Sequence, residues 1–186
     1  MRIVLVAVSL NNVIGADNTL PWKKVPEDLE HFKYRTMNHI VIMGHQTHLS
    51  LSHHGKKYLP HRLNVIVTRG GDVHQTVLDV PEENAQVSLL SPDQLTDKVL
   101  EEYEEKFPHR HLCFIGGMSI YQKVLQEKWV DRVCITRIKE TVPLDRVKDP
   151  ATIRYWNDDL LTGYHPISKY PLGKTVHIVE EYSKNE

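Results

Sequence analysis

The stretch 20-LPWKKVPEDLEHF-32 contains the start of a predicted helix, and it places an acidic residue, Asp28, on the apolar face of that helix. Pro26 and two acids stand where first helical turns favour them, so we expect a helix over residues 26–36. Asp28, Phe32 and Thr36 recur every four residues and share one face of that helix. Taken alone, Asp28 is most simply an acid at the positive helix start. A buried carboxylate is costly unless it is paired, which also makes Asp28 a functional candidate.

Strand-like and helix-like segments alternate on either side of this helix. Continuous apolar runs predict strands covered on both faces at residues 3–10, 40–43, 64–68, 111–115 and 133–138. Helices are expected at residues 45–51, 92–105 and 117–127. Residues 163–169 and 174–182 suggest a terminal hairpin, whereas residues 140–159 carry no clear pattern. The alternation predicts an α/β fold with a mixed, mostly parallel central sheet flanked by helices and an antiparallel C-terminal edge.

Length and composition narrow the class of protein. A chain of 186 residues suits a single domain over residues 1–186. The formal net charge of −1 argues against nucleic acid as a partner, and no segment is long enough to cross a membrane. Cys113 and Cys134 lie in apolar runs, which indicates buried free thiols and a cytoplasmic location. The twelve histidines show no zinc spacing, so we expect solvated loop histidines and no metal.

The stretch at residues 20–32 resembles the signature of dihydrofolate reductases: proline–tryptophan, then proline, one residue, aspartate, and phenylalanine four positions later. Further motifs resemble the family in the same order along most of the chain. They are VAV at 6–8, VIG at 13–15, VIMGHQT at 41–47, LPHRLNVIVTR at 59–69, IGGMSIY at 115–121 and VCIT at 133–136. Each motif is weak by itself, but the ordered set is specific.

The resemblance implies transfer of a hydride from NADPH to C6 of 7,8-dihydrofolate, giving the tetrahydrofolate used in one-carbon metabolism and nucleotide synthesis. Asp28 would accept two hydrogen bonds from the pterin ring, a bidentate match, and would promote protonation of N5 by water. Thr136 would donate to Asp28, and Trp22 would help to exclude water. Antifolates such as methotrexate or trimethoprim would occupy the same pocket.

The resemblance also implies a substrate pocket with an apolar lining. Its residues would be Leu5, Ala7, Leu29, Phe32, Leu51, Leu59 and Ile115. Ordinary core packing is the alternative, and for Leu5 and Ile115 both interpretations fit. Arg62 would bind the carboxylate of the glutamate tail, because a guanidinium fork fits that group. The alternative for Arg62 is a surface arginine after a turn.

Two glycine turns, at residues 44–47 and 116–119, are predicted to bind the NADPH pyrophosphate through the helix N-termini that follow them. In the family a cis peptide joins the glycine pair, so we expect a cis Gly116–Gly117 bond. Residues 11–24 would form a lid over the nicotinamide, with carbonyls from Ala7 and Ile14 meeting its amide. The full cofactor set would be Ala7, Ile14, Leu20, Gly44, His45, Gln46, Thr47, Thr68, Arg69, Gly116, Gly117, Met118, Ser119, Ile120 and Tyr121.

The sequence departs from the family pattern in four places, and the first is the spacing from Trp22 to Asp28, which is one residue longer than in the commonest bacterial form. His45 stands where the family commonly has arginine or lysine beside the cofactor 2′-phosphate, and Arg69 could supply that charge, which leaves NADPH favoured over NADH. Residues 52–58 form a basic insertion near the expected folate tail. The usual aspartate–threonine–x–phenylalanine–proline segment is missing, and Asp145 is the nearest acid to its place.

Two other functions stay open at this point. A pyrimidine reductase of riboflavin synthesis shares the fold but should lack the proline–x–aspartate helix. A catalytically inactive fold relative with a structural or binding role is the other alternative, and the divergent late region keeps it open. With no long apolar surface evident, we expect a monomer.

Overall fold

The computed structural model describes residues 1–52, 57–70 and 75–186, with Ser52 described by its backbone alone. The helices are α1 (Pro26–Thr36), α2 (His45–Ser52), α3 (Asp97–Lys106) and α4 (Met118–Gln126). The strands are β1 (Arg2–Val8), β2 (Val13–Gly15), β3 (Ile40–Gly44), β4 (Leu63–Val67), β5 (Leu78–Val80), β6 (Ala85–Leu90), β7 (Leu112–Gly116), β8 (Arg132–Arg137), β9 (Arg154–Tyr155), β10 (Tyr164–Pro171) and β11 (Ile178–Lys184).

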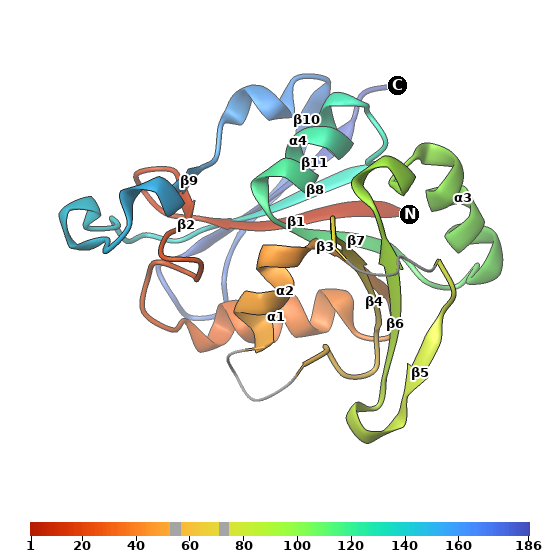
Figure 1. The fold of residues 1–186 in the computed structure, drawn as a ribbon. Coiled ribbons are helices and arrows are strands. Elements are labelled where there is room, and N and C mark those ends of the chain that lie inside the picture. Colours follow the sequence, from red (N-terminus) through yellow and green to blue (C-terminus); the bar gives the residue numbers. More distant parts are fainter. Residues whose placement is uncertain (53–56, 71–74) are drawn as a thin grey trace.

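Within these residues one nine-stranded sheet has the order β10-β11-β8-β1-β7-β3-β4-β6-β5 (Figure 1). The strands from β8 to β6 pair in parallel, whereas β11 and β10 add an antiparallel edge after β8. The predicted α/β fold with a mostly parallel sheet and an antiparallel C-terminal edge is confirmed. A second antiparallel edge, where β5 pairs with β6, was not predicted.

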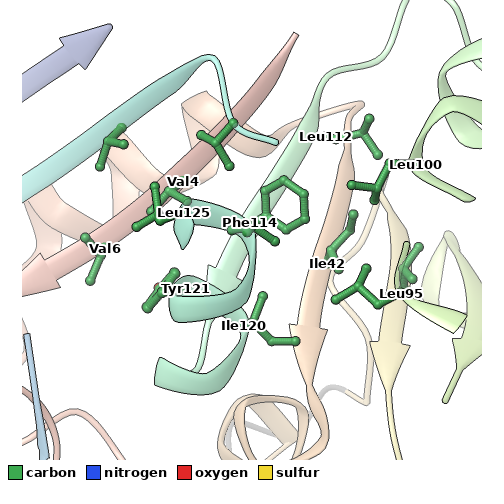
Figure 2. Close-up of a cluster of buried hydrophobic side chains, with 14 of the residues drawn as sticks. Val4, Val6, Ile42, Leu95, Leu100, Leu112, Phe114, Ile120, Tyr121 and Leu125 are labelled. Carbon is green, nitrogen blue, oxygen red and sulfur yellow. The ribbon is translucent and has the colours of Figure 1, made fainter. Parts of the chain in front are cut away.

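Two buried clusters cover the two faces of the sheet. One contains Phe114 of β7 with Leu100 of α3 and Leu125 of α4, whose side chains meet over the strands in Figure 2. The other contains Cys113 of the same strand with Val25 and, partly buried, Phe32 of α1. Alternate residues of a strand point to opposite faces, so the continuous apolar runs reflect burial on both sides.

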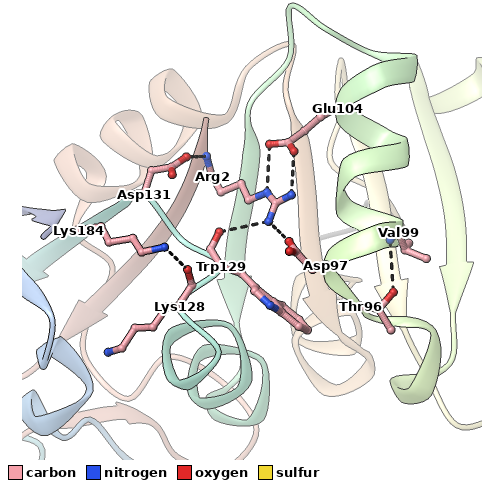
Figure 3. Close-up of polar contacts among 9 residues, drawn as sticks. All are labelled: Arg2, Thr96, Asp97, Val99, Glu104, Lys128, Trp129, Asp131 and Lys184. Atoms are coloured by element: carbon pink, nitrogen blue, oxygen red, sulfur yellow. Dashed lines mark hydrogen bonds and ion pairs between the residues drawn. The ribbon is translucent and has the colours of Figure 1, made fainter. Parts of the chain in front are cut away.

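The helix predicted over residues 92–105 is wrong in its first part. A 3₁₀ turn spans Pro92–Gln94, closed by a capping box between Ser91 and Gln94. The Thr96 hydroxyl then accepts a hydrogen bond from Val99 N–H at 3.3 Å and starts α3 afresh (Figure 3). Each cap satisfies backbone donors locally, which divides the segment into two short elements.

β6 went unpredicted because its sequence, AQVSLL, breaks the apolar run with polar residues. Its Ser88 is nevertheless buried, and the hydroxyl lies 2.7 Å from the Tyr103 hydroxyl of α3. A buried hydroxyl is tolerated when it is hydrogen-bonded. Because the partner of Ser88 lies in α3, the sequence of β6 alone does not reveal a buried strand.

The first strand is anchored to the rest of the domain through Arg2, which is buried. The Arg2 guanidinium forms ion pairs with Asp97 and Glu104 of α3, the latter at 2.9 Å. The backbone N–H of Arg2 donates to the Asp131 carboxylate at 2.8 Å (Figure 3). β1 therefore begins at Arg2, one residue before the predicted strand. Both cysteines are free and buried, and no helix among the described residues is long and apolar enough to span a membrane.

Candidate active site

A cavity of about 1100 Å³ opens at the carboxyl ends of the parallel strands β1, β3, β4, β7 and β8. Loops that leave one edge of a parallel sheet converge there, which is where ligands of such folds commonly bind. All but three of the predicted site residues line this cavity. The exceptions are Trp22, Leu59 and Arg62.

Asp28 lies in the first turn of α1, where its N–H donates to Val25 O at 3.1 Å. Burial raises the pKa of the Asp28 carboxyl, and a hydrogen bond from the Thr136 hydroxyl opposes this rise. Thr136 is 4% exposed and pairs with Ala7 of β1 in the sheet. The predicted Asp28–Thr136 pair is therefore present. It places a carboxylate in an apolar cavity, where both of its oxygens can accept hydrogen bonds from two adjacent N–H groups of a planar ligand.

The helix stripe predicted from the sequence is also present. Phe32 lines the cavity below Asp28, and Thr36 is fully buried with its hydroxyl donating to Phe32 O at 2.8 Å. Leu5, Ala7, Leu29, Leu51 and Ile115 complete an apolar lining on this side. Leu5, Ala7, Phe32, Leu51 and Ile115 also belong to the core cluster beneath α1, so these residues both line the cavity and pack in the core.

The two glycine turns lie side by side at the cavity, at the ends of the neighbouring strands β3 and β7. A Cβ at Gly44 would lie 3.7 Å from Gly117 N. A Cβ at Gly116, whose φ is +127°, would lie 3.1 Å from Thr47 Oγ1. The Gly116–Gly117 peptide is cis, as predicted. The N-termini of α2 and α4 open onto this spot, where first-turn N–H groups lack acceptors within the helix and suit a diphosphate.

Basic side chains lie around the cavity on several elements. His45 and Arg69 line it as predicted. Lys123 of α4 and Arg154 of β9 also line it, and neither was predicted. Lys123 could have been found from the spacing of α4, because it lies in the second turn of the helix that starts at the glycine pair. Arg154 comes from the stretch without a pattern.

Arg62 is not a surface arginine, so that alternative is wrong. It is 6% exposed, with Nε donating to Pro60 O at 2.8 Å and Nη1 donating to Thr36 Oγ1 at 2.9 Å. Burial lowers the pKa of its guanidinium. Its hydrogen-bond acceptors in the described part of the chain are neutral, so a buried positive charge is left to meet an anion. It lines a second cavity of about 480 Å³ with His61 and Arg110.

Trp22 and Leu59 pack into the cluster beneath α1 instead of lining the cavity. Both side chains are partly buried. Burying a large apolar side chain against the edge of the core removes it from water, which stabilises this position. Leu59 N–H is fixed by Asn64 Oδ1 at 2.9 Å. Most of the basic insertion at residues 52–58 lies outside the described residues, including His53, His54 and Lys56.

The segment predicted to form the lid, residues 11–24, is held by residues 140–159, the stretch that carries no clear pattern in the sequence. β2 of the lid pairs with β9, and Leu20 lines the cavity. Asp17 accepts hydrogen bonds from Lys148 N–H at 3.0 Å and Asp149 N–H at 2.8 Å, and these lower its carboxyl pKa. Its own N–H donates to Thr152 Oγ1 at 2.7 Å. The supporting carboxylate therefore comes from the lid itself, whereas Asp145 lies exposed.

A family model described as dihydrofolate reductase matches residues 1–159. The chain belongs to the dihydrofolate reductase family. It is 34% identical to dihydrofolate reductase type 9 of Escherichia coli over 154 residues, covering 82% of this chain and 78% of the relative. It is 31% identical to dihydrofolate reductase of Staphylococcus aureus over 153 residues, covering 82% and 80%.

The fold is also similar to a solved dihydrofolate reductase from Enterococcus faecalis, complexed with NADP(H) and RAB-propyl. The TM-score is 0.71 at 21% identity, with 100% of this chain and 97% of the other covered. The family match ends at residue 159, so β10 and β11 lie beyond it. The carboxyl-terminal hairpin therefore lies outside the family match, although the solved structure covers it.

Three titratable residues near Asp28 went unpredicted in this family member. His31 of α1 and Cys134 of β8 line the cavity, and burial raises the pKa of the Cys134 thiol to about 12. His177, directly before β11, is buried, and its Nδ1 accepts a hydrogen bond from Lys139 N–H at 3.0 Å. The signal for His31 was its place three residues after Asp28 on the helix. No local pattern marks His177, because it reaches the site through strand pairing.

Proposed function

We propose that this protein reduces 7,8-dihydrofolate to tetrahydrofolate with NADPH. The observation that carries the proposal is the buried Asp28–Thr136 pair, which lies in one cavity with both glycine turns. Membership of the dihydrofolate reductase family supports it. The Asp28 helix argues against a riboflavin-pathway pyrimidine reductase, and the complete floor of the cavity argues against an inactive scaffold.

Asp28 orients the substrate by accepting hydrogen bonds from the pterin 2-amino group and the ring N3–H. Thr136 fixes the carboxylate by donating to it. In this apolar site the carboxylate favours a positively polarised ring, so N5 takes its proton from water more readily. Leu20 and Ile14 exclude bulk water from the reacting carbons, and Trp22 braces the lid from the neighbouring cluster.

The residues present fit NADPH, which supplies the hydride when bound. Gly44, Gly116 and Gly117 leave room for a diphosphate, and the remaining residues predicted for the cofactor surround them in the cavity. Arg69, with His45 beside the α2 N-terminus, gives the preference for the 2′-phosphate and hence for NADPH over NADH.

The substrate tail is bound by Arg62, whose buried charge takes the glutamate carboxylate. Two of its N–H groups are already held by neutral acceptors, which pre-orients the guanidinium. Leu59 packs behind this tail site. Antifolates such as methotrexate or trimethoprim occupy the pterin pocket. We further propose that residues 1–186 act as one monomeric cytoplasmic domain without nucleic-acid or membrane partners.

The test is oxidation of NADPH by the purified protein with and without dihydrofolate. We expect turnover that requires dihydrofolate, stops with methotrexate and falls when NADH replaces NADPH. A folded protein without such turnover would exclude the proposal, and activity on a pyrimidine intermediate of riboflavin synthesis would favour the alternative reductase. Folding is checked by circular dichroism and by binding of NADPH alone.

A further inference from the structure

The carboxyl-terminal hairpin of β10 and β11 approaches the active-site cavity on the α1 side of the sheet. β11 pairs with β8, with Glu181 opposite Cys134, which lines the cavity. On its other side Glu181 lies opposite Ser168 of β10. Val179, two residues earlier on β11, belongs to the cluster beneath α1. Because alternate residues of a strand share a face, the Glu181 side chain also lies on the α1 side.

The Glu181 carboxylate is bound by one side chain of α1 and two of β10. Arg35 of α1 forms an ion pair with its Oε1 at 2.6 Å. The Tyr170 hydroxyl donates to the same oxygen at 3.1 Å, and the Ser168 hydroxyl donates to Oε2 at 3.3 Å. Burial alone would raise the pKa of the Glu181 carboxyl, but the charge of Arg35 and these hydrogen bonds bring that pKa below its ordinary value. The carboxylate is therefore a charged acceptor for Tyr170 at neutral pH.

The Tyr170 hydroxyl also contacts His31, which lines the cavity three residues after Asp28. His31 Nε2 lies 3.4 Å from Tyr170 Oη, and the two rings meet edge to face with centroids 6.5 Å apart. A tyrosine hydroxyl has one proton, and Tyr170 donates it to Glu181. Tyr170 Oη can then only accept from His31, so the neutral imidazole carries its proton on Nε2. Burial, together with the charge of Arg35, lowers the pKa of His31 and favours this neutral ring.

We propose that His31 is a binding residue for the pterin end of the substrate, and that Tyr170 is its positioning residue, acting from the hairpin. The proposal rests on the proposed function, which places the pterin ring at Asp28. Residues three apart on a helix are neighbours, and His31 lines the same cavity, so its imidazole lies beside a ring held by that carboxylate. A ring whose tautomer and orientation are already fixed loses less freedom when the ligand binds.

The test removes one hydroxyl from each face of the hairpin. Tyr170→Phe removes the acceptor for His31 and keeps the aromatic ring. Tyr182→Phe is the matched control, because the Tyr182 hydroxyl donates at 3.0 Å to Glu180, which Arg137 holds on the opposite face of β11. We expect Tyr170→Phe to weaken dihydrofolate binding about three- to tenfold and to leave NADPH binding unchanged. Tyr182→Phe should change neither affinity, although each variant loses one hydrogen bond and some stability.

Two further measurements separate positioning from a merely structural contact. ¹⁵N NMR of the ligand-free protein reports the His31 tautomer, and we expect the Nε2–H form in the unaltered protein and in Tyr182→Phe, but a mixture in Tyr170→Phe. In a His31→Leu background, Tyr170→Phe should no longer change the affinity for dihydrofolate, because the residue through which it acts is absent. An Nδ1–H tautomer in the unaltered protein, or additive losses of affinity in the double variant, would overturn the proposal.

Failure of this proposal is distinguishable from failure of the proposed function. If dihydrofolate does not bind the folded, unaltered protein, the proposed function is wrong and this proposal with it. If dihydrofolate binds Tyr170→Phe and the unaltered protein equally well, this proposal alone is wrong. Should Tyr170→Phe fail to fold, the unaltered protein still decides the question. We expect dihydrofolate to shift the His31 ring signals, and signals that do not move on binding would overturn the proposal.

Discussion

The floor and the lid of the cavity are built in different ways. The floor comes from β1, β7, β8 and α1, whose side chains enter two buried clusters. The lid is held to the stretch 140–159 by the short β2–β9 pair and by polar bonds around Asp17, Lys148 and Asp149, which are exposed or nearly so. Burial on both sheet faces stabilises the floor, whereas the lid rests on a few bonds open to water.

Because of this difference, we expect the floor to govern the chemical step and the lid to govern closure of the cavity. Residues of the floor sit in elements that cannot move without exposing core, so they can hold a carboxylate in place. Lid contacts of low local stability can open for ligand exchange. Substitutions in the floor should therefore act on the chemical step with normal lid behaviour, and substitutions in the lid should act on closure with normal chemistry.

The largest effect is expected from Asp28→Asn, which keeps the shape of the floor and removes its charge. Loss of acid–base assistance should lower the rate of hydride transfer to dihydrofolate by about 10²–10⁴-fold. Single-turnover kinetics measures this directly, and NADPH binding followed by fluorescence serves as the control. Weakened binding of NADPH to the same degree would mean that the floor does not separate substrate from cofactor.

The same substitution should change how stability depends on pH. Burial raises the pKa of Asp28 above its ordinary value of 3.8, so the folded state binds a proton that the unfolded state releases. Stability supported by this proton is present in acid and is lost as pH rises through the shifted pKa. Urea unfolding from about pH 4 to about pH 7 should show Asp28→Asn gaining stability over the unaltered protein as pH rises. A constant difference would contradict the burial of this charge.

A smaller effect is expected at the cofactor end of the floor. Arg69→Gln removes a cation that lines the cavity after β4, and it should raise the KM for NADPH about tenfold while the KM for NADH stays nearly unchanged. His45→Gln is the comparison and should have less effect, because an imidazole contacts a phosphate less strongly than a permanently charged guanidinium does. Equal changes with both cofactors would show that Arg69 does not read the 2′-phosphate.

The floor and the lid also differ in how far the sequence predicts them. The β1 and β8 strands, the Asp28 stripe and both glycine turns follow from local patterns, since burial imposes an apolar run and a tight turn requires glycine. β6, Arg154 and His177 were missed because their partners are distant in the chain. Arg62 was placed at the surface in one alternative because its buried position depends on Thr36 of α1, which no spacing in its own segment reveals.

The smallest effect is expected from Asp17→Asn in the lid. One carboxylate accepts from the backbone of both Lys148 and Asp149, and the neutral amide retains an acceptor for one of them. Closure should weaken and the rate under saturating substrate should change only a few-fold. Protection of these two amides from hydrogen exchange, relative to their intrinsic exchange rates, should fall in the variant. In the unaltered protein it should fall as pH drops below 3.8, because the bonds that lower the Asp17 pKa weaken on protonation. Asp145→Asn is the matched control. Asp145 is the acid nearest to the place of the missing family segment and lies exposed, so its substitution should alter neither the hydrogen exchange nor the rate. Faster exchange with an unchanged rate would mean that docking to residues 140–159 does not govern closure.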